Sequence, residues 1–163
     1  MSALFSMTKG KEIPIKIMLS LFDSFVSSIL SYSCEVWGFI QSVVLERVHR
    51  KFLKQLLNVK QSTSNVAIYG EFGRFPLTIN FQTRILKYFL KLYSVKANNC
   101  ILDTVINKMR FDIDTGNNTT MWALNVKNLL QHCGFYDVWL FPESVKIDVF
   151  VPLLRRRLLD IYI

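Results

Sequence analysis

The sequence predicts an all-α protein, an irregular helical bundle of about five to seven helices. Two observations support this fold class. Apolar residues recur at helical spacing along most of the 163 residues, and no segment alternates apolar and polar residues as a half-buried strand does. Hydrophobic residues make up 51% of the chain, and aromatic residues make up 13%. This composition excludes an intrinsically disordered chain, which lacks the apolar surface needed to offset the entropy of ordering.

The first half of the chain predicts three helices. The run from Lys16 to about Ser33 is nearly all apolar, which is typical of a helix packed on several sides. The segment Val44–Asn58 has neither Gly nor Pro and predicts a second helix. Its apolar stripe consists of Leu45, Val48, Phe52 and Leu56. A third helix is expected after Pro76, because proline suits the first turn of a helix. Its apolar stripe consists of Phe81, Ile85, Tyr88, Phe89 and Leu92.

The sequence QSTSNVAIYGEFGRFPL joins the second predicted helix to the third and is predicted to be a structured loop. Its Ser, Thr and Asn residues, together with Gly70 and Gly73, favour a loop. Apolar residues such as Ile68 and Tyr69 are expected to anchor that loop to the core. The segment is no phosphate-binding loop, because it matches neither GxGxxG nor GxxxxGK[ST].

The second half of the chain is also helical in pattern. Its predicted elements are a short helix at Ile101–Met109, a polar turn in DIDTGNNTT, a helix at Trp122–Cys133 closed by Gly134, a short apolar segment at Gly134–Trp139 and a helical tail at Ser144–Ile163. The tail carries three consecutive arginines, Arg155 to Arg157. We interpret this run either as a localisation or membrane-surface patch or as ordinary surface charge.

The positive charge of the chain is concentrated in one stretch. The net charge is +8, and the whole excess falls within residues 44–98. Residues 44–60 carry five basic side chains against Glu46, and residues 61–98 carry five against Glu71. A local excess of this kind is the electrostatic footprint of a protein that binds a phosphate backbone.

Two sets of basic residues are the candidate binding site. On the second predicted helix, Arg47, Arg50, Lys51 and Lys54 fall opposite the apolar stripe, without an interleaved acid. On the third, Arg84, Lys87 and Lys91 share a face beside the apolar stripe. We expect the two helices to present these cations outward together, as one grip for nucleic-acid strands. A plain basic surface is the alternative. We interpret His49 as a histidine at the margin of the core.

The sequence offers little for catalysis or metal binding. It has three cysteines at long spacings and two histidines, which form no zinc pattern and no disulfide framework. Asp112 and Asp114 form the only close acid pair, and their surroundings do not fit a calcium loop. No nucleophile or metalloprotease motif occurs. We therefore expect no metal, no cofactor, no small-molecule substrate and no enzymatic activity.

The run from Ile17 to Cys34 is the one candidate for a membrane span. Asp23 and six serines lie in it, and a charge near the centre of a span costs about 2.5–3.5 kcal/mol. We therefore expect a core helix and no membrane partner. The N-terminal residues have no secretory signal pattern, so an intracellular protein with free thiols is expected.

Two blocks of the sequence carry a family resemblance. They are LFDSFVSSILSYSCEVWGF, at 21–39, and LERVHRKFLKQLLNVKQSTSNVAIYGEFGRFPL, at 45–77. They resemble the stretch downstream of the polymerase palm in the reverse transcriptases of non-LTR (LINE-type) retrotransposons. The pattern of that family reads roughly LFD-x-LV-x-x-IL-x-YG-x-EVWGF, then IERVH-x-KF-x-K-x-LL, then ST-x-N-x-x-VYGELGR-x-PL. The sequence departs from it in having Ser33 for Gly, Ser64 for Pro and Phe72 for Leu.

The resemblance implies a helical thumb and the connection beyond it, which help such polymerases to hold the primer–template duplex. It divides the chain into a thumb-like region with the basic patch, 1–98, and a connection and tail, 99–163, packed in one domain. The polymerase motif of the family, an aromatic residue followed by x-Asp-Asp, does not occur in this sequence. We therefore expect a non-catalytic fragment or relic of such an enzyme that binds RNA or DNA backbones.

Three alternatives stay open. One is a protein-interaction or membrane-surface helical module whose apolar helix at 16–33 lacks its original partner. Another is a chain without a selected function. The third is an enzyme that works only when another chain supplies the palm. A palm-containing reverse transcriptase chain is then the expected partner.

Overall fold

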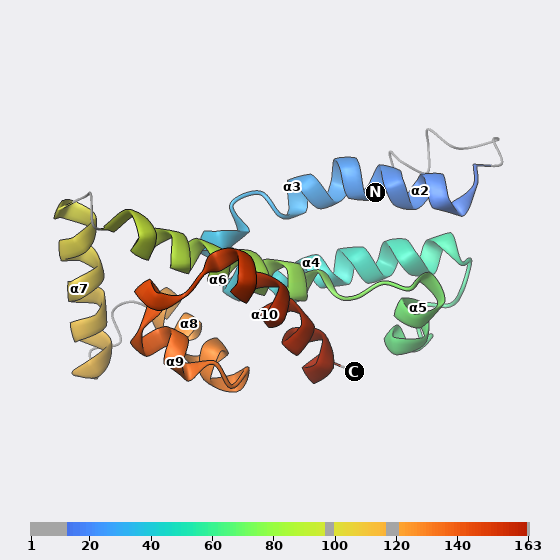
Figure 1. The fold of residues 1–163 in the computed structure, drawn as a ribbon. Coiled ribbons are helices and arrows are strands. Elements are labelled where there is room, and N and C mark those ends of the chain that lie inside the picture. The colour runs from blue at the N-terminus through green and yellow to red at the C-terminus, as the bar shows by residue number, and fades with distance from the viewer. Residues whose placement is uncertain (1–12, 97–99, 117–120, 163) are drawn as a thin grey trace.

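The computed structural model describes residues 13–96, 100–116 and 121–162. Regular structure in these ranges is helical without a strand, so the all-α prediction is confirmed. Helices α4 and α6 run along the length of the molecule. Helix α5 lies at one end, α7 lies at the other, and α10 crosses α6 near the middle (Figure 1).

An apolar helical rod opens the described part of the chain. It consists of α2 (Ile15–Leu21), the π-helix η1 (Phe22–Ser27) and α3 (Ser28–Leu30). Met18 and Phe22 are buried against α4. The prediction that this rod is packed on several sides is wrong for the described residues, because Phe25 and Ile29 on its other side are 61% and 74% exposed.

The two longest helices, α4 (Cys34–Leu56) and α6 (Leu77–Lys96), pack against each other. The predicted helix at 44–58 is therefore the second half of a longer one. Gly38 lies in the contact between the two helices: a Cβ at this position would lie 3.1 Å from Ile85 Cδ1 and 3.4 Å from Phe81 Cβ. The missing side chain of Gly38 thus lets α6 cross α4 at short range.

Between these helices, the predicted loop contains a helix, α5 (Asn65–Phe72). The loop prediction is wrong for these residues because Ile68 and Tyr69 lie on one buried side of a helical turn. Gly73 ends α5 with a left-handed φ of 59°, a conformation that glycine adopts without strain.

The second half of the chain folds into shorter helices around α6. They are α7 (Cys100–Asp114), α8 (Met121–His132), α9 (Tyr136–Leu140), the 3₁₀-helix η2 (Pro142–Ser144) and α10 (Ile147–Tyr162). Gly134 closes α8 with a φ of 78°, as predicted. Helix α7 extends past Met109, so Asp112 and Asp114 are helical and not part of a turn. Residues 117–120 of the predicted turn lie outside the described residues.

Two large hydrophobic cores hold these helices together, and a third, small cluster of Cys34, Leu77 and Phe81 joins α4 to α6. The smaller core joins the rod, the second half of α4 and α5 through Met18, Phe52 and Ile68. The larger core surrounds α6 and includes residues from α7 to α10. Helix α6 belongs to the first predicted region, 1–98, yet its apolar side packs with the helices of the second region.

No single helix of the described chain is long and apolar enough to cross a membrane. The segments Ile15–Leu30 and Cys34–Ile40 meet that length and composition only as a pair, which is bent by 87°.

Candidate nucleic-acid interface

The four predicted cations of α4 surround one recess. Its volume is about 460 Å³, and its lining residues are Arg47, Arg50, Lys51, Lys54, Gln61 and Asn65. Arg47 and Lys51 are exposed, and Arg50 is half-buried. No acidic side chain belongs to this lining, which we call the α4 group. Sequence reasoning missed Gln61 and Asn65 because it treated their segment as a loop.

Lys54 does not face outward as predicted. Its side chain is buried, and Nζ donates a hydrogen bond of 2.7 Å to the backbone oxygen of Gln61. The reason is the end of α4: the chain turns at Asn58, which has a φ of 53°, and residue 61 folds back over Lys54. Lys54 therefore fastens this turn to the helix, and the outward charge of the α4 group comes from Arg47, Arg50 and Lys51.

Arg50 lines the recess and is half-buried. Its Nε donates to the Glu46 backbone oxygen at 3.4 Å. Burial and the nearby Glu46 carboxylate raise the pKa of Tyr162, near the end of α10, and the Arg50 charge partly opposes this rise. The Arg50 charge thus reaches Tyr162 as well as the recess.

Glu46, the one acid of residues 44–60, is directed into the protein. Its carboxylate accepts hydrogen bonds from the Tyr69 hydroxyl, from His49 Nδ1 at 3.3 Å and from the Thr78 backbone N–H at 3.3 Å. Burial alone would raise the pKa of Glu46, but these hydrogen bonds outweigh it and lower the pKa. Glu46 therefore stays ionised inside, without an ion pair to Arg47 or Lys51.

The three predicted cations of α6 lie around a different recess. Its volume is about 240 Å³, and its lining residues are Glu35, Arg84, Lys87, Tyr88 and Lys91. Arg84 donates to Glu35 Oε1 through Nε at 2.9 Å and through Nη2 at 2.7 Å. Burial raises the pKa of Glu35, but hydrogen bonds and the Arg84 and Lys91 charges outweigh burial and lower it. We call these lining residues the α6 group. The carboxylate of Glu35 offsets part of the positive charge of this group.

The structure does not join the two groups into one grip. No residue lines both recesses. Glu35, which holds Arg84, lies twelve residues before Arg47 on α4, and this distance is about 18 Å along a helix. From its crossing with α4, α6 continues toward α7, whereas the second half of α4 continues toward α5 (Figure 1). The predicted single surface is therefore two separate groups.

The described residues contain neither a cluster of metal ligands nor a disulfide. No three His, Cys, Asp or Glu side chains gather there in a way that could hold a metal ion. Asp112 and Asp114 instead lie near Lys108 and Lys127, at 4.0 and 3.8 Å. All three cysteines are free thiols.

Comparison of the chain with family models, with curated proteins and with solved structures finds no match.

Proposed function

We propose that this chain is a thumb-like, non-catalytic part of a retrotransposon reverse transcriptase, and that its α4 group binds the sugar–phosphate backbone of RNA or DNA. The α4 group carries this proposal, because its recess is lined by four basic residues without an acidic one. The resemblance of residues 21–39 and 45–77 to the segment after the palm supports the same function.

The chemistry of the recess suits a phosphate backbone. Arg47 and Lys51 are exposed and lie four residues apart on one helix, so their charges reach neighbouring positions along a strand. The carbonyl and amide groups of Gln61 and Asn65 offer further hydrogen bonds to phosphates or sugars. Contacts of this kind fix a strand without reading its bases, so binding is expected to be independent of sequence.

A salt titration with a labelled RNA–DNA duplex tests the proposal. We expect affinity to fall steeply between about 50 and 200 mM salt, since each neutralised phosphate contributes about −0.7 to −0.9 to the log–log slope. The double variant Arg47→Gln/Lys51→Gln should reduce the magnitude of that slope by about 2.

The matched control is Lys87→Gln/Lys91→Gln. It removes the same charge from two exposed lysines of the α6 group and should leave the slope nearly unchanged. Equal losses in both double variants would mean that net charge alone binds the duplex, and an unchanged slope in the α4 variant would contradict the proposal outright.

A palm-containing chain is the partner that this function implies. Synthesis requires closely placed carboxylates that hold two metal ions, and the described residues offer no such group. Mixing this chain with a palm-containing fragment should produce template-dependent synthesis only in the mixture. Synthesis by this chain alone would contradict the non-catalytic assignment.

An apolar surface favours a second function, that of a protein-interaction or membrane-surface module. Its members, each more than 60% exposed, are Phe25 and Ile29 of the rod, Tyr32 of the turn after it, and Val36, Ile40 and Val43 of α4. Exposed apolar patches of this extent bind partners or membranes. Flotation with liposomes, without retention on nucleic acid, would favour this module over the backbone-binding function.

A further inference from the structure

One face of α10 borders the turn between α5 and α6. Arg155, Leu159 and Tyr162 are spaced i, i+4 and i+7 and therefore lie on one side of the helix. Arg155 and Leu159 line a cavity on the Gly73–Phe75 turn, and Tyr162 lines a second hollow on the same turn. The two ends of this face, Arg155 and Tyr162, are about 10 Å apart along the helix.

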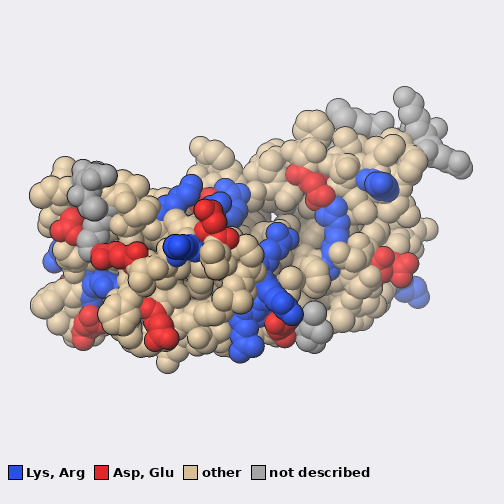
Figure 2. Space-filling view, viewed as in Figure 1, with Lys and Arg blue, Asp and Glu red and all other residues tan. Residues whose placement is uncertain are grey.

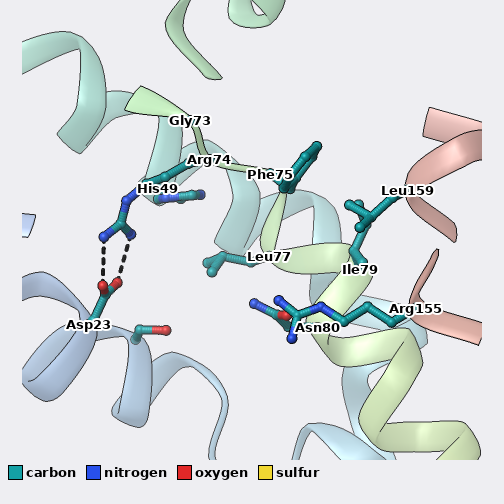
Figure 3. Close-up of a pocket in the computed structure, with 11 residues that line it drawn as sticks. Asp23, His49, Gly73, Arg74, Phe75, Leu77, Ile79, Asn80, Arg155 and Leu159 are labelled. Carbon is teal, nitrogen blue, oxygen red and sulfur yellow. Dashed lines mark hydrogen bonds and ion pairs between the residues drawn. The ribbon is translucent and has the colours of Figure 1, made fainter. Parts of the chain in front are cut away.

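The cavity at the Arg155 end is polar. Its volume is about 350 Å³, and Arg74, Arg155, Asn80 and His49 contribute to its walls (Figure 3). Asp23 is the acid in the lining, and Arg74 binds it bidentately at 2.7 and 2.6 Å. Arg155 forms no ion pair with an acid of the described chain, so the cavity retains a net positive charge. Figure 2 shows Lys and Arg side chains around a hollow in the middle of this face.

His49 adds a polar atom without a partner to the wall of this cavity. The residue is 1% exposed, and its Nε2 has no hydrogen-bond partner in the described residues. Because Glu46 accepts hydrogen bonds from all its partners, Nδ1 of His49 carries a proton. Nε2 is therefore an acceptor in the neutral ring and a donor in the imidazolium.

The hollow at the Tyr162 end is apolar and aromatic. Its volume is about 280 Å³, and its lining consists of Val66, Tyr69, Gly70, Gly73, Arg74, Phe75 and Tyr162. Phe75 and Tyr162 are 44% and 49% exposed, so both rings are accessible to a ligand. Flat aromatic molecules stack on such rings.

The turn that the two hollows share is held by the backbone. Gly73 N–H donates to Gly70 O at 3.1 Å, and Arg74 N–H donates to Tyr69 O at 2.9 Å. This helix-ending pattern fixes the backbone of the turn, and Gly73, Arg74 and Phe75 line both hollows. The polar cavity and the aromatic hollow therefore share one wall, whose backbone is held by these bonds.

We propose that the two hollows form one binding site for a small phosphate monoester that carries an aromatic ring, such as a nucleoside monophosphate. The phosphate lies in the polar cavity against Arg155 and Asn80, and the ring lies against Phe75 and Tyr162. Arginine and amide donors match the oxygens of a phosphate, and the combined volume is within the range of small-ligand sites, about 300–1,000 Å³.

Calorimetry with adenosine 5′-monophosphate tests the site on the full chain. We expect this probe to bind at least tenfold more tightly than adenosine or inorganic phosphate, because each of these fills only one hollow. Equal affinity for the monophosphate and for inorganic phosphate would overturn the joint site, and so would a complete lack of monophosphate binding.

Two pairs of variants separate the hollows. Arg155→Gln should weaken binding of the monophosphate at least tenfold, whereas Arg156→Gln, an exposed neighbour outside both linings, should leave it unchanged. Phe75→Ala should weaken binding of adenosine, whereas Phe141→Ala, an exposed phenylalanine elsewhere, should not. Equal effects within either pair would contradict the site.

This site is independent of the α4 group. Arg47→Gln/Lys51→Gln should retain affinity for the monophosphate, and Arg155→Gln should retain affinity for the duplex. Failure of one site therefore leaves the other proposal standing.

Discussion

The two glutamates of helix α4 lie in different environments. Glu35, in its first turn, points to the side of the α6 group and binds Arg84. Glu46, one turn before Arg50, is buried and bound by Tyr69, His49 and Thr78. The first acid offsets a surface cation, whereas the second is held by groups inside the protein. The charge available on a helix thus depends on where its acids point as well as on its count of lysines and arginines.

The largest expected contrast between these glutamates is in stability. Glu46→Ala leaves several buried donors without a partner, and we expect it to lower the free energy of unfolding by about 3 kcal/mol. Glu35→Ala removes a partly exposed ion pair and should cost less than about 1 kcal/mol. Urea unfolding of both variants measures the difference. Similar losses would contradict the contrast.

Low pH should lower the stability of the protein through the buried glutamate, Glu46. The pKa of Glu46 is lowered in the folded protein from its usual 4.5, so its ionised form contributes stability above that pH. This contribution should be lost as the pH falls through the lowered pKa. Unfolding midpoints measured from about pH 7 to about pH 3 should fall less in Glu46→Gln than in the wild type. Parallel curves would show that Glu46 does not govern acid sensitivity.

Substitution of Lys54, in the α4 group, should cause a smaller loss of stability. Lys54→Met keeps the buried stem and removes the hydrogen bond to Gln61, so we expect a loss of about 1 kcal/mol in unfolding free energy. The slope of duplex binding against salt should stay the same, because this ammonium is buried in the recess wall. A slope reduced by about 1 would instead make Lys54 a phosphate contact.

The smallest effect is expected from freeing Arg84. Glu35→Gln adds one net positive charge to the α6 group, about 18 Å from Arg47 along α4. This distance exceeds the Debye length of about 8 Å at physiological salt, so duplex affinity should hardly change. Tighter binding with a steeper salt slope would show that the α6 group belongs to the interface after all.

Periodicity was sufficient to predict most of the helical elements. Phe52 and Phe89 of the predicted stripes lie in the cores as expected, whereas Tyr88 is exposed, and Gly134 ends its helix as predicted. The helix α5 escaped prediction because the Ser and Thr residues before it, together with its own Asn65 and Gly70, outweighed two buried anchors. Ser64 before it and Gly73 after it were the start and stop signals that could have revealed it.

The basic residues of the candidate site could be predicted from the sequence, but their arrangement on the surface of the protein could not. A helical wheel places Lys54 beside Arg50, but it contains no information on the turn that brings residue 61 back over the lysine. Likewise, the crossing of α4 and α6 at Gly38 sets how far Arg84 lies from Arg47, and a single sequence gives no such crossing. Both failures come from tertiary contacts between distant residues.

The three thiols have unequal access to reagents. Burial raises the pKa of the Cys34 thiol to about 11 and also raises that of Cys133, whereas Cys100 lies exposed at the start of α7. Alkylation depends on the thiolate and on access to it, so Cys100 is the position at which a maleimide dye attaches. A single fluorophore can therefore be placed on α7, away from the linings of both basic recesses and of both hollows beside α10, without altering any other residue.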